Sequence, residues 1–201
     1  MKLLPFLALS VAVATPAFAQ ETRQLDSHEH GVGQLDIAFD GTKIAMELHA
    51  PGADIVGFEY AAESSEDRAA IDAAVAMLAK PLDLFVLTDA AGCSVVKASA
   101  GLESEESHDD HGDEHADEED GHDDHDEEDH EEHASEAGHT EFHAEYLLTC
   151  ADPTAVTEIT FAYFETFPNA LEVEVQLISD TGATSFEVER AAPTLDLRGM
   201  F

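Results

Sequence analysis

The fold of this chain is decided in the stretch Leu35-Asp-Ile-Ala-Phe-Asp-Gly-Thr-Lys-Ile-Ala-Met-Glu-Leu48. Apolar and polar residues alternate on both sides of Asp40-Gly41, and this period of two is typical of strands with one buried face. An Asp-Gly pair between two such runs is a strong signal for a β-hairpin. The stretch therefore predicts two antiparallel strands, the second with Ile44, Met46 and Leu48 facing inward.

Similar patterns recur along the chain. Further strands are expected at residues 82–88, 93–99, 141–150, 156–164, 171–178, 184–189 and 194–197. One helix is expected from Ser64 or Ser65 to Lys80, because a serine N-cap precedes an apolar stripe and Pro81 follows it. About 140 residues outside the N-terminal leader and an acidic tract are enough for one domain with a sizeable core. We therefore expect a mainly β fold with two packed sheets, formed by residues 20–201 as a single domain.

Residues 1–19 have the pattern of a secretory signal peptide. Lys2 precedes an apolar run from Leu3 to Val13, and Ala17-Phe-Ala19 forms a small-x-small cleavage site. We expect cleavage after Ala19 and export into a bacterial periplasm. No Cys follows this site to take a lipid, and no later run approaches the ~20 apolar residues that span a bilayer. We therefore expect no membrane insertion.

An acidic tract at residues 103–141 contains eight histidines and twenty-one acidic residues, without a Lys or Arg. Such a composition cannot form a packed core, because burying unpaired charges is costly, so we expect a disordered insertion. Imidazole nitrogens suit zinc, nickel and copper, whereas carboxylates alone would serve calcium or magnesium. The tract therefore predicts binding of several transition metal ions, and the choice among the three metals stays open.

The tract histidines are spaced so that a helical turn would bring pairs of them to one side. The candidate ligands are His108, His111, His115, His122, His125, His130, His133 and His139. His111-Gly-Asp-Glu-His115 also matches the His-x-x-Glu-His motif of inverted zinc peptidases, but that motif belongs on a packed helix beside a cleft. The chain has no nucleophile elbow, phosphate-binding glycine loop or cofactor fingerprint, so we do not expect an enzyme.

The formal net charge is −37 at pH 7. Loss of Lys2 with the leader makes it −38, the tract accounts for −21, and −17 remains on the rest of the chain. Such a surface repels nucleic acid and anionic lipid and accumulates cations. Nucleic acids are thus excluded as partners, and divalent metal ions are favoured.

The two cysteines, Cys93 and Cys150, lie on either side of the acidic tract. In an oxidising compartment an even pair is first interpreted as a disulfide. A crosslink around a loop of this length contributes roughly 4 kcal/mol on the chain-entropy model and would hold the roots of the tract. The alternative is a pair of thiolate metal ligands, which the absence of a Cys-x-x-Cys spacing disfavours.

Further histidines lie outside the tract. His28 and His30 would point to one side of an extended segment, and alternation places His49 and His143 on the outward faces of their strands. The outward face around His143 also carries Glu141. A structural zinc site needs about four ligands in a tetrahedron. We therefore predict an ordered metal site drawing on His28, His30, His49 and His143, completed by a carboxylate or water where needed. The alternative is that these are ordinary exposed histidines.

Several short motifs together resemble a family of exported bacterial proteins, the ZrgA-like family of zinc-regulated periplasmic zinc-binding proteins. The motifs are His28-Glu-His-Gly31, Pro51 followed by Val56-Gly-Phe-Glu59, Cys93, Tyr146 four residues before Cys150, and an aromatic stretch ending in Phe164-Glu-Thr-Phe-Pro168. The resemblance runs from about His28 to Leu197. Similar members often carry His after the Phe-Glu pair, where this chain has Tyr60, so Tyr60 is not taken as a ligand.

This resemblance implies a β-sandwich with short flanking helices, Zn²⁺ binding, and assistance to a zinc ABC importer through its periplasmic binding protein. The leading hypothesis is a periplasmic protein that captures or buffers zinc and passes it to that receptor. The alternatives are an exported acidic interaction module with incidental metal binding, and the handling of another divalent metal such as nickel or copper.

Overall fold

The computed structural model describes residues 29–104 and 139–201. The predicted signal peptide, His28, the tract histidines from His108 to His133 and residues 105–138 of the tract lie outside the described residues. The predicted disorder is wrong at the two ends of the tract, where Glu103 and Glu141 are opposite each other on paired strands. Among the predicted ligands, His30, His49, His139 and His143 are described.

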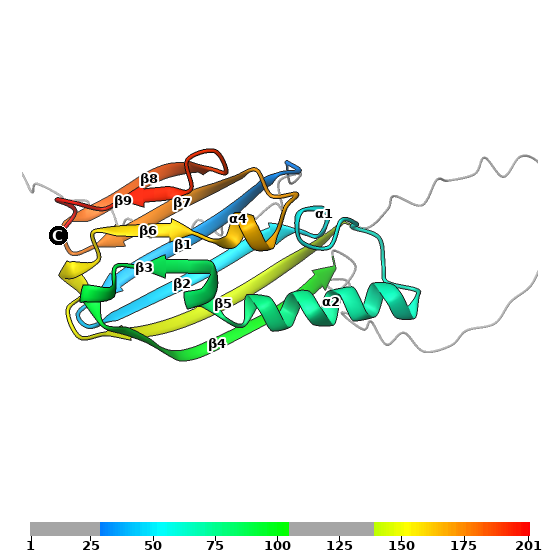
Figure 1. The fold of residues 1–201 in the computed structure, drawn as a ribbon, viewed down its shortest axis with the longest axis horizontal. Coiled ribbons are helices and arrows are strands. Elements are labelled where there is room, and N and C mark those ends of the chain that lie inside the picture. Colours follow the sequence, from blue (N-terminus) through cyan, green and yellow to red (C-terminus); the bar gives the residue numbers. More distant parts are fainter. Residues whose placement is uncertain (1–28, 105–138) are drawn as a thin grey trace, which may run out of the picture.

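Six strands form a large sheet in the order β4-β5-β2-β1-β7-β8 (Figure 1). Neighbouring strands are antiparallel except for β1 and β7, which are parallel. The strands are β1 (Val32–Asp40), β2 (Lys43–Pro51), β4 (Cys93–Ser104), β5 (Thr140–Cys150), β7 (Glu172–Ser179) and β8 (Gly182–Glu189).

The hairpin predicted around Asp40-Gly41 is confirmed, because β1 and β2 pair from Asp40 and Lys43 onward. Gly41 takes a left-handed φ of 56° in the two-residue loop, a conformation that glycine adopts without a steric penalty. The predicted alternation also holds, since Ile44, Met46 and Leu48 are all buried. One face of the sheet is therefore apolar and faces the core.

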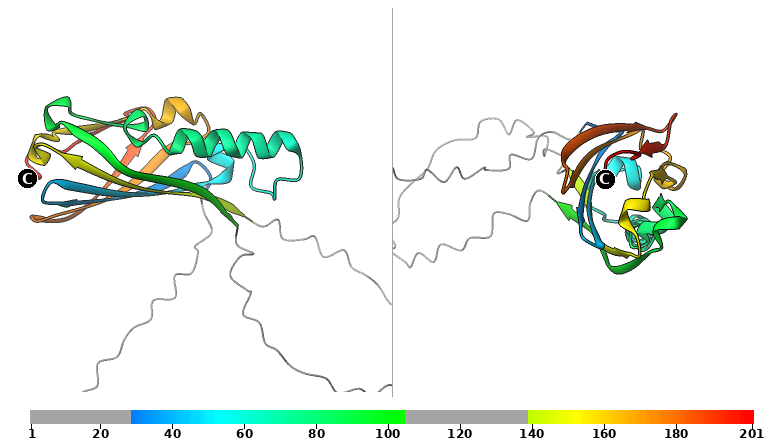
Figure 2. Two further views of the ribbon diagram at one scale, coloured as in Figure 1. Left: turned by 90° about the horizontal axis from the view of Figure 1, so that it is seen from below. Right: turned by 90° about the vertical axis from the view of Figure 1, so that its left-hand side faces the viewer.

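A small sheet and the helices cover this apolar face (Figure 2). The small sheet has the order β3-β6-β9, with β3 (Phe85–Leu87), β6 (Glu158–Phe161) and β9 (Thr194–Asp196). The short helices are α1 (Gly52–Ile55), α3 (Pro81–Leu84) and α4 (Tyr163–Thr166), with 3-10 turns at Asp89–Ala91 and Pro153–Ala155. The fold is thus the mainly β sandwich with few helices that the sequence predicts.

Aromatic side chains fill the space between the two layers. The ring of Phe85 lies 5.4 Å from that of Phe161 and 5.9 Å from that of Tyr163, and all three are fully buried. Burial of such a side chain stabilises the folded state by about 1.5–3 kcal/mol relative to leaving it exposed. This cluster fixes the small sheet and α4 on the large sheet, and leaves the opposite face of the large sheet for other contacts.

The long helix α2 (Ser65–Leu78) runs beside the edge strand β4 (Figure 1). The Ser64 side chain accepts the N–H of Asp67, and the Asp67 carboxylate accepts the N–H of Ser64, so the two residues form a capping box. The helix ends at Leu78, two residues before the predicted Lys80. Leu78 and Ala74 are its buried contacts with the core.

Two predicted strands are shorter than expected because helical turns replace part of each. Within residues 82–88 the chain first forms α3, which has Pro81 at its first position, where a missing N–H costs nothing. Within residues 156–164 the strand β6 ends at Phe161, and α4 then turns Tyr163 and Phe164 into the aromatic core.

Strands β4 and β5 carry both the disulfide and the two ends of the undescribed segment. Cys93 and Cys150 are opposite each other and form the predicted disulfide, with an S–S distance of 2.06 Å. Ser104 is opposite Thr140 at the other end of the pair, roughly 35 Å away at about 3.3 Å per residue. The strand pairing itself, rather than the disulfide, therefore holds residues 104 and 140 together. No helix in the described part of the chain is long and apolar enough to cross a membrane.

Candidate metal centre

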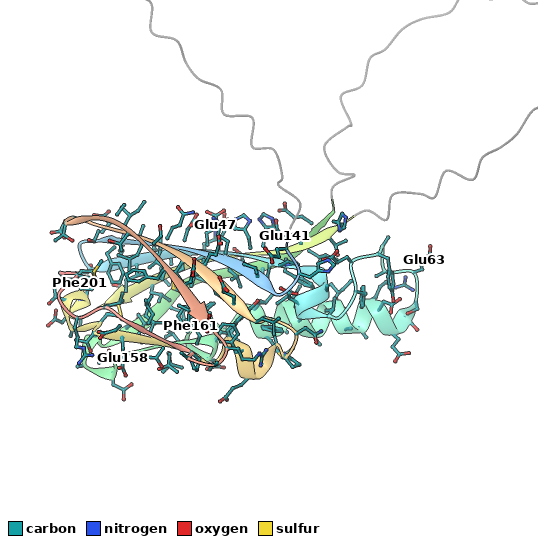
Figure 3. The ribbon with its side chains drawn as sticks, turned by 90° about the horizontal axis from the view of Figure 1, so that it is seen from above. Glu47, Glu63, Glu141, Glu158, Phe161 and Phe201 are labelled. Carbon is teal, nitrogen blue, oxygen red and sulfur yellow. A yellow bond between two sulfur atoms is a disulfide. The ribbon has the colours of Figure 1, made fainter. Side chains whose placement is uncertain are left out.

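The face of the large sheet opposite the core carries rows of polar side chains. In one row Gln34, His49 and His143 are successive neighbours across β1, β2 and β5, and the adjacent row contains Glu47 and Glu145. Figure 3 shows Glu47 and Glu141 on this face, which no helix or strand of the described residues covers. Alternation along three strands thus collects histidines and carboxylates on one accessible surface.

His49, Glu141 and His143 form the inner cluster. Glu141 Oε2 lies 2.6 Å from Nε2 of His143 and 3.5 Å from Nδ1 of His49. One ligand atom from each residue lies within 4.8 Å of the other two, and the group is half-buried or buried. The two imidazole rings meet edge to face, with centroids 4.1 Å apart. Ligand atoms of a tetrahedral zinc lie roughly 3.3 Å apart when each bond is about 2 Å, so small side-chain shifts would admit the ion.

Two more glutamates border the inner cluster. Glu47 Oε1 lies 3.2 Å from Nε2 of His49, on the ring nitrogen that does not face Glu141. Glu103 Oε2 lies 3.7 Å from Nε2 of His143. Glu103 and Glu141 are directly opposite each other on β4 and β5, and like charges in that arrangement repel. A cation bound between them would remove this repulsion.

The carboxylates also change the protonation of the cluster. The hydrogen-bonding interaction with Glu141 raises the pKa of His49 above its ordinary value; partial burial opposes this rise, and Glu47 adds to it. The proton is therefore held to a higher pH than on a free histidine. A metal ion that binds His49 must displace this proton, because only the neutral imidazole is a ligand.

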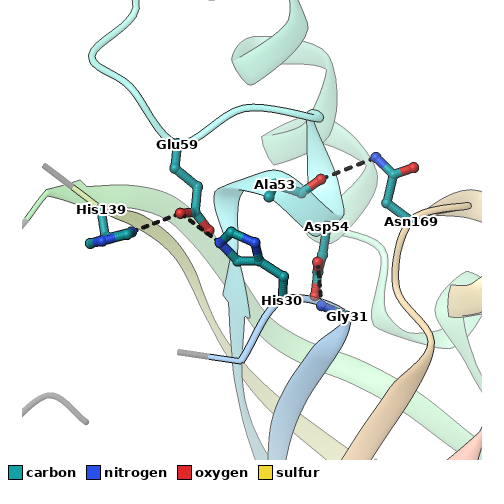
Figure 4. Close-up of polar contacts among 7 residues, drawn as sticks. All are labelled: His30, Gly31, Ala53, Asp54, Glu59, His139 and Asn169. Atoms are coloured by element: carbon teal, nitrogen blue, oxygen red, sulfur yellow. Dashed lines mark hydrogen bonds and ion pairs between the residues drawn. The ribbon is translucent and has the colours of Figure 1, made fainter. Parts of the chain in front are cut away.

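His30, Glu59 and His139 form the outer cluster (Figure 4). A single oxygen, Oε2 of Glu59, lies 3.0 Å from Nε2 of His30 and 2.8 Å from Nδ1 of His139. Burial alone would raise the pKa of Glu59, but the hydrogen bonds with His139 and His30 outweigh burial, so its pKa lies below the ordinary value. The carboxylate is thus held in its charged form between two imidazoles.

Polar contacts fix the backbone around the outer cluster. The Asp54 carboxylate accepts the N–H of Gly31 at 2.8 Å, directly after His30. Burial raises the pKa of Asp54, and the bond from Gly31 opposes that rise. The side chain of Asn169 donates to the carbonyl of Ala53 at 3.0 Å and holds α1, which leads to the loop with Glu59.

The structure brings His49 and His143 together, as the outward-face pattern predicts, and adds Glu141 to them. It places His30 in the separate outer cluster, with His139 and Glu59. Metal ligation by each of these histidines stays a prediction. The sequence pattern does not identify Glu59 as a ligand, because this residue lies in a loop without periodicity.

A shallow apolar groove lies beside the inner cluster on the same face. Its volume is about 440 Å³, and its lining includes Ala38, Ala45, Leu147 and Ile178 together with Glu47. These four apolar residues are neighbours across four strands and form one row. On each strand, this row lies two residues away from the row that contains Glu47. The surface next to the inner cluster is therefore partly apolar with an acidic border.

Comparison with known proteins gives one result that bears on this site. Residues 27–197 match the model of a family described as ZrgA family zinc uptake protein. The match covers the described residues up to Leu197 and includes every residue of the two clusters. No curated protein matches the chain.

Proposed function

Because this chain belongs to the ZrgA family of zinc uptake proteins, we propose that it is a periplasmic zinc-binding protein that captures or buffers zinc. We further propose that it passes the ion to the periplasmic binding protein of a zinc ABC importer. Membership of the family supports a role connected with zinc. The periplasmic location, the buffering and the importer are our own extension.

The observation that carries this proposal is the inner cluster. His49, His143 and Glu141 converge from two neighbouring strands. Glu103 Oε2 lies at the edge, 3.7 Å from Nε2 of His143, and is available as a fourth ligand. Two imidazoles and two carboxylates would complete a tetrahedral zinc site on a rigid sheet. Because the strands hold the ligands in place without metal, little ordering entropy is lost on binding. We therefore assign the tightest zinc ion to this cluster.

The presence of two imidazoles favours a transition metal over calcium or magnesium, which prefer ligand sets made only of oxygen. Nickel and copper also accept imidazole, and copper binds most divalent sites more strongly than zinc does. The family supports zinc as the ion handled. We propose that metal supply in the compartment, rather than the ligand set, selects it.

We propose a binding role rather than an enzymatic one. A catalytic zinc keeps one coordination position open for water or substrate, whereas a closed site has four protein ligands. Glu103 and Glu141 together with the two histidines would close the inner cluster in this way. The expected readout is an absence of hydrolytic turnover by the zinc-loaded protein.

Export is supported by the leader pattern in residues 1–19 and by the disulfide between Cys93 and Cys150. Disulfides persist in oxidising compartments and are rare in the cytosol. The groove beside the inner cluster offers a receptor an accessible surface close to the bound ion. An exported acidic module with incidental metal binding would need neither a groove beside the metal ligands nor a preformed ligand set.

The test is a zinc titration of the mature protein and of the double variant His49→Ala/His143→Ala. The matched control is His122→Ala/His125→Ala, which also removes two histidines but takes them from the acidic tract. Native mass spectrometry gives the identity and number of bound ions, and competition with a chelator gives the tightest affinity. We expect the first variant alone to lose the tightest ion. Equal behaviour of both variants would favour the acidic module.

A further inference from the structure

We propose that the outer cluster is a second metal site, through which zinc exchanges with the surroundings, whereas the inner cluster holds the ion. This inference rests on the proposed zinc-binding function and extends it to a different set of residues. The ligands come from three separate segments: His30 precedes β1, Glu59 follows α1, and His139 precedes β5.

The geometry of the outer cluster suits a divalent transition metal. Both imidazole nitrogens approach the same oxygen of Glu59, at 3.0 Å and 2.8 Å (Figure 4), and all three ligand atoms lie within 4.8 Å of one another. Zinc ligands at about 2 Å from the ion lie roughly 3.3 Å apart, so shifts of a few tenths of an ångström in the Glu59 contacts would admit the ion. Two imidazoles and a carboxylate are donors that zinc uses in proteins.

Two of the three ligand-bearing segments, those of His30 and Glu59, are held in place independently of a metal. The carboxylate of Asp54 binds the N–H next to His30, and Asn169 holds the carbonyl of Ala53 at the start of α1. Gly57 takes a φ of 85° and donates its N–H to the same carbonyl, which directs the chain toward Glu59. The outer cluster is therefore preorganised, and this distinguishes it from a chance meeting of surface side chains.

Exposure separates the two clusters. The side chains of His30 and His139 are 62% and 57% exposed, whereas those of His49 and His143 are 18% and 27% exposed. Three ligands from the described residues also leave one tetrahedral position open to water or to another donor. An incoming ligand can occupy that position before an old bond breaks, which makes exchange fast. The closed and shielded inner cluster lacks this route.

The two clusters are also close along one strand. His139 and Glu141 are two residues apart, so they point to the same side and their Cα atoms are separated by roughly 7 Å. An ion released from the outer cluster is therefore already beside the carboxylate of the inner cluster. We infer that zinc passes through the outer cluster on its way to and from the inner one.

The test uses the full mature chain with Glu59→Gln and, independently, His30→Ala/His139→Ala. The matched control is Glu63→Gln, which changes an exposed glutamate in the same loop. Native mass spectrometry counts the zinc ions, and rapid mixing with a weak chromogenic chelator measures the release of each fraction. Melting of the metal-free proteins checks that every variant is folded.

We expect Glu59→Gln and the double histidine variant each to lose one ion from the rapidly released fraction. The tightest affinity should stay unchanged, while loading of the inner cluster slows several-fold. The inference is overturned if Glu59→Gln and the double histidine variant bind as many ions as Glu63→Gln and release them at the same rate, while His49→Ala/His143→Ala still loses the tightest ion. In that case the proposed function survives. If no variant loses an ion, both the inference and the proposed function fail.

Discussion

Replacement of Glu47 by Ala tests whether the inner cluster is a preorganised site or a loose collection of charges. Nδ1 of His49 faces Glu141, and Nε2 faces Glu47 at 3.2 Å. When Nδ1 binds the metal, the N–H at Nε2 donates to Glu47, which fixes the tautomer and the ring orientation. Loss of such a partner typically weakens metal binding about 10- to 100-fold, which corresponds to roughly 1.4–2.7 kcal/mol. We expect a loss in this range for the tightest zinc ion.

The matched control is Glu145→Ala. Glu145 is directly opposite Glu47 on the neighbouring strand, so its removal takes the same charge from the same row of the sheet. Its carboxylate pairs with Lys97 at 3.1 Å and not with a histidine of the inner cluster. Both groups of that pair are largely exposed, so its loss costs little stability.

Competition between each variant and a zinc chelator of known affinity measures the effect. We expect Glu47→Ala to weaken the tightest site by at least about tenfold and Glu145→Ala to change it much less. Equal losses in the two variants would refute the reasoning, because long-range charge alone would then explain the affinity. No loss in Glu47→Ala would show that His49 needs no orienting partner.

Three further outcomes follow from the same structure. Because neighbouring carboxylates raise the pKa of His49, the proton competes with zinc for this side chain over a wider pH range. The zinc affinity should therefore be lower at pH 5.5 than at pH 7.5, and equal affinities in titrations at the two pH values would contradict this. Replacing Cys93 and Cys150 by Ser should lower stability toward denaturant by about 4 kcal/mol but leave the tightest zinc affinity unchanged, because the disulfide lies at the far end of β4 and β5. Gly52→Ala should lower the free energy of unfolding by about 1–3 kcal/mol, because the added Cβ would lie 2.5 Å from the hydroxyl of Thr140 and 2.7 Å from the carbonyl oxygen of Phe58. The control is Gly101→Ala, whose Cβ meets no atom within 4 Å, so this variant should melt like the wild type.

Local sequence pattern accounts for the large sheet because burial on one face imposes a period of two. The hairpin of β1 and β2 is the clearest case: Leu35 and Leu48 are opposite each other and fully buried. A slip of one residue would turn every buried side chain outward, so the register is strongly specified. The short helices α3 and α4 escaped prediction, because four-residue turns are too short to show a helical period.

The candidate site was only partly predictable for a different reason. The outward positions of His49 and His143 follow from alternation within their own strands. Their meeting depends on the pairing of β2 with β5, which are far apart in the chain, and nothing in the local pattern specifies that pairing. The partnership of His30 with Glu59 depends further on a loop whose path is set by contacts of α1.

The central claim is that zinc binds between β2 and β5 on the open face of the large sheet. Anomalous diffraction at the zinc edge from crystals of the zinc-loaded protein tests it most directly. We predict a peak about 2 Å from a ring nitrogen of His49, a ring nitrogen of His143 and an oxygen of Glu141. The account would be contradicted if His49, His143 and Glu141 kept their present contacts in the zinc-loaded crystals and every anomalous zinc peak lay elsewhere.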